Sequence, residues 1–352
     1  MKQMILTLMA MLLAVSAAAQ SRKQVQEYYY WINQAELAIC DSNYQRASDC
    51  YHTAFAIKRP CIRDAHFAFK LHTEYLYDLE RACEAFHFLA LSGDKAYFSD
   101  GDPYVDDTVT YAELWQHIKL ISDTTQSLVI EDLWNKAHEM SRLDQQVRFA
   151  SYENDSVASA TIAHTDSLNF QKMQQVFKQY KNFSEYHSGF GGGFSDALFI
   201  HFARMGFASP DVFLLKMVKR GDCPPANYIR IYDCCYHSII KNDDKTTYGT
   251  DPSYTYIINN TLFIRYPDNV KQIDRNRKKL NFAETWADYV KKVLYVNQRK
   301  EGFWFYPKQF VIHGDKAEEE QREKDERARY DSGEIKGAYY DLDPDIFNYI
   351  FN

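Results

Sequence analysis

The spacing of hydrophobic residues along the chain predicts a mainly α-helical protein. Near the N-terminus, apolar and small side chains recur every three or four residues, the period of a helix with one buried face. The first run carries Trp31 and Ala35, and Pro60 closes the second. The second run carries Tyr44, Ala47, Tyr51 and Ala54. Two helices joined by a short turn are therefore expected before Pro60.

The same spacing returns one repeat length later in "YDLERACEAFHFLALSGD". Together the two copies resemble tetratricopeptide (TPR) repeats, helix-turn-helix units in which small residues lie where the helices touch. Ala38 stands where that repeat usually has a large aromatic residue, and an ordinary helical hairpin stays open as the alternative. Two such repeats rarely bury their own faces. The unit over residues 20–98 must therefore pack against the rest of the chain or a partner.

Periodicity then divides the rest of the chain. An acidic stretch with Gly101 and Pro103 predicts a linker, followed by a connecting helix, over 99–125. Helical spacing predicts an α-helical domain over 126–296. Its expected helices cover 130–148, 167–180, 194–205, 226–240 and 273–294. In the extension over 297–352, "GFWFYPKQFVIHG" predicts a hairpin or extended segment and "DKAEEEQREKDERARYD" a charged helix. The fold class is mainly α, with N-terminal TPR-like hairpins, an α-helical domain and a small β or irregular C-terminal segment.

The first residues, "MKQMILTLMAMLLAVSAAAQ", have the three-part pattern of a secretory signal peptide over 1–19. Cleavage is expected near Ala19-Gln20, which predicts a periplasmic or secreted protein. The apolar run is shorter than the roughly 20 residues a permanent span needs, and no later segment predicts an integral membrane helix. The net charge of −7 without a dense basic patch argues against a nucleic-acid partner.

Seven cysteines are present, and export would permit disulfides. Their spacing forms no CxxC pair, which argues against a zinc site. The pairing of the cysteines stays open, and an odd count leaves at least one free thiol.

Polar residues on apolar helix faces are the candidate chemistry. His201 shares the stripe of Leu198, Asp233 lies inside the stripe of the helix expected over 226–240, and Asp144 and Arg148 are one helical turn apart. Such groups could act as acid–base machinery, with His201 as the titrating group. They could equally form an ion network that only fixes helix packing. Metal binding by His201 with Asp233 and Asp144 is an open alternative, but no close ligand pair such as HxxxH or HxxE supports it, so neither a metal nor a cofactor is expected.

The stretch "GFGGGFSDALFIHFARMG" contains Gly191 and leads into the His201 helix. A phosphate loop needs a preceding strand and usually a following basic residue, and neither is present. The glycines therefore predict a turn, and a role in lining a site beside His201 stays open. Asp166 is expected to cap a helix start, with Asn169 returning the bond. Tyr248 belongs to a predicted glycine turn.

Several short motifs occur in an order typical of one bacterial family: "LDQQVRF", "TDSLNFQKMQQVF", the Gly-rich turn, His201, Asp233, "YGT" and "IDRNRKKLNF". Over about residues 131–293 the chain resembles the domain-of-unknown-function family six-six-two-four, often found in exported proteins. The chain departs from the family pattern at Ile200, Cys234 and Thr247. The resemblance implies no known reaction. It implies that five residues form one constellation: Asp144, Arg148, Asp166, His201 and Asp233.

Three functions are compatible with these patterns. Binding of a protein or peptide by the N-terminal repeats, in the cell envelope, is preferred because it needs no catalytic site. The alternative is a hydrolase-like acid–base enzyme centred on His201, with Asp233 and Asp144, in which Arg148, Asp166, Asn169, Gly191 and Tyr248 bind the ligand. The third is a purely structural envelope protein. An exposed aromatic groove on the N-terminal hairpins would favour binding, and a polar cluster open to a pocket would favour an enzyme. A closed, fully paired cluster would favour a structural protein.

Overall fold

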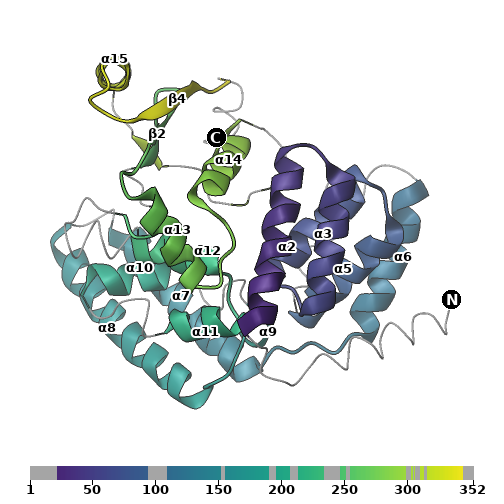
Figure 1. The fold of residues 1–352 in the computed structure, drawn as a ribbon. Helices are drawn as coiled ribbons and strands as arrows, with labels where there is room; N and C mark the ends of the chain where they lie inside the picture. Colours follow the sequence, from purple (N-terminus) through teal and green to yellow (C-terminus); the bar gives the residue numbers. More distant parts are fainter. Residues whose placement is uncertain are drawn as a thin grey trace.

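The computed structural model describes residues 22–93, 109–151, 155–189, 196–206, 213–233, 246–250, 254–298, 303, 305, 310–312 and 315–343. Within these residues the chain is mainly helical with one small sheet, and the predicted fold class is confirmed (Figure 1). The predicted signal peptide lies outside the described residues, as do Gly191 and most of the predicted linker.

The N-terminal part is built from paired helices that lie side by side in Figure 1. They are α2 (Arg22–Cys40), α3 (Tyr44–Ile57), α4 (Ile62–Lys70), a π-helical turn η1 (Leu71–Tyr75) and α5 (Leu79–Leu91). Asn43 and Asp78 cap the starts of α3 and α5, because each side chain accepts the amide three residues on. The alanines of the sequence pattern are fully buried where helices meet: Ala35, Ala47, Ala54 and Ala82.

The C-terminal helix α14 (Trp286–Asn297) packs on α2, so the N-terminal helices pack against the rest of the chain. Asn33 of α2 donates to Asp288 of α14 at 3.0 Å. Lys292 of α14 donates to Asn33 at 2.7 Å and to Glu36 at 2.5 Å. The α2 face that carries Asn33 and Glu36 is therefore covered by the protein itself.

The central part contains seven helices among the described residues. They are α6 (Val109–Thr124), α7 (Glu131–Ser151), α8 (Asp155–Gln179), α9 (Glu185–Ser188), α10 (Asp196–Arg204), α11 (Leu214–Arg220) and α12 (Pro225–Ile231). Helices α7 and α8 pack along each other, and α10 contacts both. The predicted start of α8 is wrong, because the polar stretch before Asp166 is helical from Asp155 onward. Asp166 therefore lies in mid-helix and is no N-cap.

A four-stranded sheet completes the fold, in the order β3-β1-β2-β4. Its strands are β1 (Thr255–Ile258), β2 (Thr261–Arg265), β3 (Phe310–Ile312) and β4 (Gly337–Asp341). The hairpin is β1–β2, joined through Asn259 at a φ of 45°, a conformation that asparagine tolerates. The segment over 302–314, predicted as a hairpin or an extended segment, is extended at its described strand β3, which pairs in parallel with β1. The predicted charged helix is present as α15 (Lys316–Asp331).

The long helix predicted over 273–294 is two helices. The first, α13 (Val270–Lys279), ends before Asn281, whose φ of 64° leaves the helical region. Thr285 then starts α14 with a capping box, since its side chain and that of Asp288 each accept the other's amide. The Thr285–Asp288 spacing was the sequence signal for this break.

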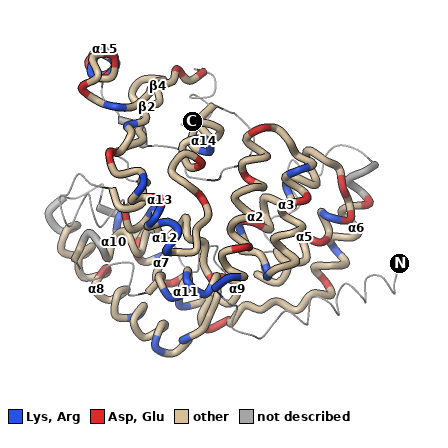
Figure 2. Tube along the Cα trace, viewed as in Figure 1, with Lys and Arg blue, Asp and Glu red and all other residues tan. Residues whose placement is uncertain are grey.

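Buried apolar residues from both the N-terminal and the central helices form one cluster, from Val25 to Leu342. No disulfide joins the five described cysteines to one another: Cys40, Cys50, Cys61, Cys83 and Cys223. In the described chain, no helix is both long enough and apolar enough to cross a bilayer. Figure 2 shows Lys and Arg residues interspersed with Asp and Glu residues along the described helices.

Candidate functional site

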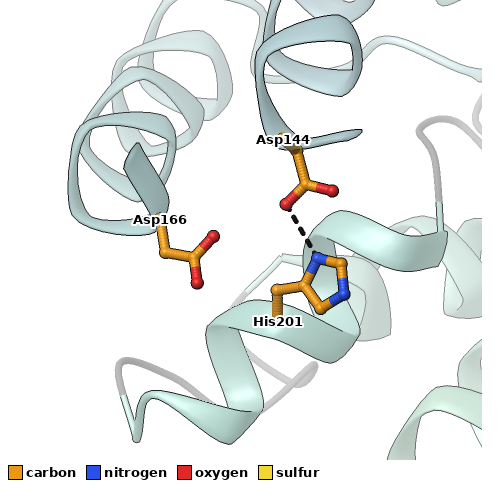
Figure 3. A group of neighbouring side chains, drawn as sticks. All are labelled: Asp144, Asp166 and His201. Atoms are coloured by element: carbon orange, nitrogen blue, oxygen red, sulfur yellow. Dashed lines mark hydrogen bonds and ion pairs between the residues drawn. The ribbon is translucent and has the colours of Figure 1, made fainter. Parts of the chain in front are cut away.

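Three helices bring four of the predicted site residues together. Helix α7 supplies Asp144 and Arg148, which share a face because they are one turn apart. Helix α8 supplies Asp166, and α10 supplies His201. Figure 3 shows the two carboxylates and the imidazole facing a common space. These four residues are called the His201 cluster below.

The two ring nitrogens of His201 have different partners. Nδ1 lies 2.7 Å from Oδ1 of Asp144, and a carboxylate can only accept, so Nδ1 carries a proton. Nε2 lies 3.0 Å from Nε of Arg148, which can only donate, so Nε2 accepts through its lone pair. Gln145 donates to the other oxygen of Asp144 at 2.7 Å. The neighbours thus select the neutral tautomer with Nε2 free of a proton.

Arg148 is held from behind by Asp166. Its Nη2 donates to both oxygens of Asp166 at 3.0 Å, and its Nη1 lies 3.6 Å from Oδ1 of Asp144. The side chains of Asp144 and Asp166 are only 1% and 2% exposed, against 20% for Arg148 and 11% for His201. The carboxylates therefore form the back of the cluster, and the guanidinium and imidazole form its solvent side.

The charges of the His201 cluster do not balance. Two buried carboxylates face one guanidinium, and the imidazole is neutral in the tautomer described, so the net charge is −1. Burial raises the pKa of the Asp166 carboxyl, while its hydrogen bonds and attraction to Arg148 oppose the rise. A buried carboxylate without full compensation favours any added positive charge.

The donor set could hold a metal ion. One ligand atom each from Asp144, Asp166 and His201 lies within 4.8 Å of the other two. The guanidinium of Arg148 contacts all three residues, so it takes up the position that a cation would occupy. Close spacing of ligand residues in the sequence does not reveal this group, because its members come from three helices.

Asp233 lies in a different polar cluster, so its predicted pairing with His201 is not formed. Its carboxylate accepts from the hydroxyl of Thr246 at 2.8 Å and from the amides of Thr247 and Thr250 at 3.0 and 2.9 Å. Burial raises the pKa of the Asp233 carboxyl, and hydrogen bonds from Thr250 and Thr246 oppose this. Asp233 holds the loop over 246–250 in place.

The remaining predicted binding residues divide between the clusters. Tyr248 belongs to the Asp233 loop, where its amide donates to Asp233 and its carbonyl accepts from Arg277. Asn169 lies one turn from Asp166 and is 1% exposed. Its amide donates to the carbonyl of Met140 at 3.1 Å. Gly191 lies outside the described residues, but Gly189 ends α9 at a φ of 69°, as a glycine turn requires.

A second polar network escaped the sequence reasoning. Lys292, which is fully buried, donates to Glu36 at 2.5 Å and to Glu284 at 2.7 Å. Arg277, also fully buried, donates to Glu284 at 2.5 Å. We call Glu36, Lys292, Glu284 and Arg277 the buried ion chain. The sequence feature that could have indicated this network is a charge on an apolar helix face, since Glu36 lies between Ile32 and Ile39 on α2.

Comparisons with known proteins add no relative. No family model, no curated protein and no solved structure matches the chain. The resemblance to the family of unknown function therefore stays a prediction from its motifs, and the site is argued from its own geometry.

Proposed function

We propose that the central helices carry an acid–base site, centred on His201, of a hydrolase-like enzyme. The observation that carries the proposal is the contact of 2.7 Å between Nδ1 of His201 and Asp144. A carboxylate on Nδ1 fixes the ring and leaves Nε2 able to take a proton from water or a substrate hydroxyl. Arg148, oriented by Asp166, would stabilise negative charge that develops beside the ring.

Asp144 and Asp166 are positioning residues in this proposal. Each is buried and bonded to a group that reaches solvent, so each holds that group in one orientation. Arg148 occupies Nε2 of His201 in the arrangement described. Proton transfer at Nε2 therefore requires the guanidinium to move aside, which its 20% exposure allows without unpacking the core.

Protein or peptide binding by the N-terminal helices is the alternative. The face of α2 with Asn33 and Glu36 is already covered by α14, which removes one surface for a partner. Among the described residues of these helices, the strongly exposed aromatic side chains are Tyr30 and Tyr77, at 48% and 66%. Two separate tyrosines make a smaller surface than a continuous groove, so we place the acid–base site first.

Export to the cell envelope or the medium completes the proposal. A cleaved leader over residues 1–19 would place the enzyme in the periplasm or outside the cell. Mass spectrometry of the N-terminus of the protein secreted by its host tests this directly, because the expected first residue is Gln20.

The test of function compares three variants on a panel of p-nitrophenyl esters, phosphates and glycosides. His201→Gln and Asp144→Asn are expected to lower kcat/KM by about 100-fold or more, because the first removes Nε2 and the second removes the carboxylate that fixes the ring through Nδ1. His164→Ala is the matched control, since His164 is exposed on α8. Equal turnover by the parent and His201→Gln on every substrate would refute the acid–base proposal.

A further inference from the structure

The His201 cluster contains more negative than positive charge. Asp144 and Asp166 are almost fully buried, and Arg148 is the one cation among their described contacts. Binding a further anion would add to the imbalance, whereas binding a dication would reverse it. Charge therefore favours a cation over an anion as the ligand of this cluster.

The donor atoms fit a cation that prefers mixed oxygen and nitrogen ligands. Two carboxylates and one imidazole converge within 4.8 Å from α7, α8 and α10 (Figure 3). The proton on Nδ1 of His201 is donated to Asp144, so Nε2 is the nitrogen left to bind. A histidine whose other nitrogen is held by a carboxylate is the usual arrangement of a metal-ligating imidazole.

Two further oxygen atoms, one on α7 and one on α8, have no hydrogen-bond partner among the described residues. They are Oδ1 of Asn169 and Oγ of Ser141, and both atoms are buried. Asn169 is one turn from Asp166, and Ser141 is one turn from Asp144, on the same helix faces. Buried acceptors without a donor are uncommon in folded proteins, and a cation or its bound water would satisfy them.

From these observations we propose that Asp166 and Nε2 of His201, with Asp144 holding the ring through Nδ1, form a binding site for a divalent first-row transition-metal ion, such as Mn²⁺ or Zn²⁺. Imidazole and carboxylate ligands together favour these ions over Mg²⁺, which takes oxygen ligands. Arg148 holds the site in the metal-free arrangement and turns toward solvent when the ion binds. The side chain is 20% exposed, so this movement needs no change in the core.

The inference rests on the proposed function only in that both use the same cluster. As a ligand, Nε2 of His201 binds the ion and no longer accepts a proton, so protons and metal compete for one lone pair. Metal binding and turnover are therefore measured separately.

The experiment titrates Mn²⁺ into the full mature chain after treatment with EDTA and dialysis, and follows the free Mn²⁺ signal by electron paramagnetic resonance. Mn²⁺ is chosen because the free thiols of the chain bind it poorly. One site per chain is expected. Asp166→Asn and His201→Ala should each weaken binding at least 10-fold, His164→Ala should bind as the parent does, and Arg148→Met should bind as tightly or more tightly.

Circular dichroism establishes that each variant is folded, and Arg148→Met tests the site without removing a ligand. Equal binding by the parent and His201→Ala would overturn the proposal. Binding by Arg148→Met but not by the parent would also overturn it, because the guanidinium would then be the permanent cation. Metal binding without turnover on the substrate panel would refute the acid–base function and leave this site standing. Turnover that persists in EDTA, in a chain that binds no Mn²⁺, would refute the metal site and leave the acid–base function standing.

Discussion

The buried ion chain and the His201 cluster are both polar networks among packed helices, but they differ in charge and exposure. In the ion chain, two carboxylates face two fully buried cations, Arg277 and Lys292, and the adjoining pair of Arg63 and Asp64 adds one charge of each sign. In the His201 cluster, two carboxylates face one guanidinium, and the guanidinium and imidazole reach solvent. A balanced, closed network can only hold helices together. An unbalanced network with an exposed side can also accept a ligand.

Substitution of Lys292 gives the largest expected effect. Lys292→Met removes the cation that joins Glu36 and Glu284, and leaves each buried carboxylate with one cation, Arg63 for Glu36 and Arg277 for Glu284. We expect the free energy of unfolding to fall by about 3–5 kcal/mol, measured by urea denaturation. The neighbouring Lys291 forms an exposed pair with Asp41, so Lys291→Met is the matched control and should change stability by less than about 1 kcal/mol. A similar loss in both variants would contradict a structural role for the ion chain.

Acid should affect the N-terminal helices through a buried neutral histidine. Burial lowers the pKa of His72 in η1 to about 4. The unfolded chain then binds the proton first as pH falls below about 6.5, so stability is complete above that pH and is lost toward pH 4. Between pH 7 and pH 5 we expect His72 to account for about 2 kcal/mol of lost unfolding free energy.

Urea denaturation of the parent and of His72→Gln at both pH values measures that contribution. The unfolding free energy of the parent should fall more between pH 7 and pH 5 than that of the variant. Parallel losses in both proteins would show that another group is responsible.

Removal of Arg148 gives the smallest expected change in stability, and it most directly tests the difference between the His201 cluster and the buried ion chain. Arg148→Met exposes the carboxylates of Asp144 and Asp166 to water through the opening that the guanidinium filled. We expect the unfolding free energy to change by no more than about 1 kcal/mol, because residues kept for binding are often not those that best stabilise the fold. A loss as large as that of Lys292→Met would make the two networks equivalent and remove the argument for a site.

Much of the helical architecture could be predicted from local spacing, since helix faces are set by residues three and four apart. The same rule placed Asp144 and Arg148 on one face and His201 on an apolar stripe. It failed for Asp166, because the polar residues before it resemble a loop and are helical only in the context of α7. It also failed for Asp233, whose partners in the loop over 246–250 are not set by helical spacing.

The sheet and the ion chain depend on contacts between distant parts of the sequence. Strand β3 pairs with β1 across more than one helix, and no local pattern specifies that register. The charges of Glu36 and Lys292 are evident in the sequences of their helices, but neither sequence identifies the partner of its charge. Tertiary packing alone brings them together.

The docking of α14 on α2 has a consequence for the order of events during synthesis. Glu36 and Lys292 are separated by 256 positions. At roughly 5–20 residues per second, the ribosome completes Glu36 about 10–50 seconds before Lys292 exists. Throughout that interval the face of α2 is uncovered and its carboxylate has no ammonium partner. The N-terminal helices can therefore reach their final state only after nearly the whole chain is made, and nascent chains stopped before α14 should be sensitive to protease in this region.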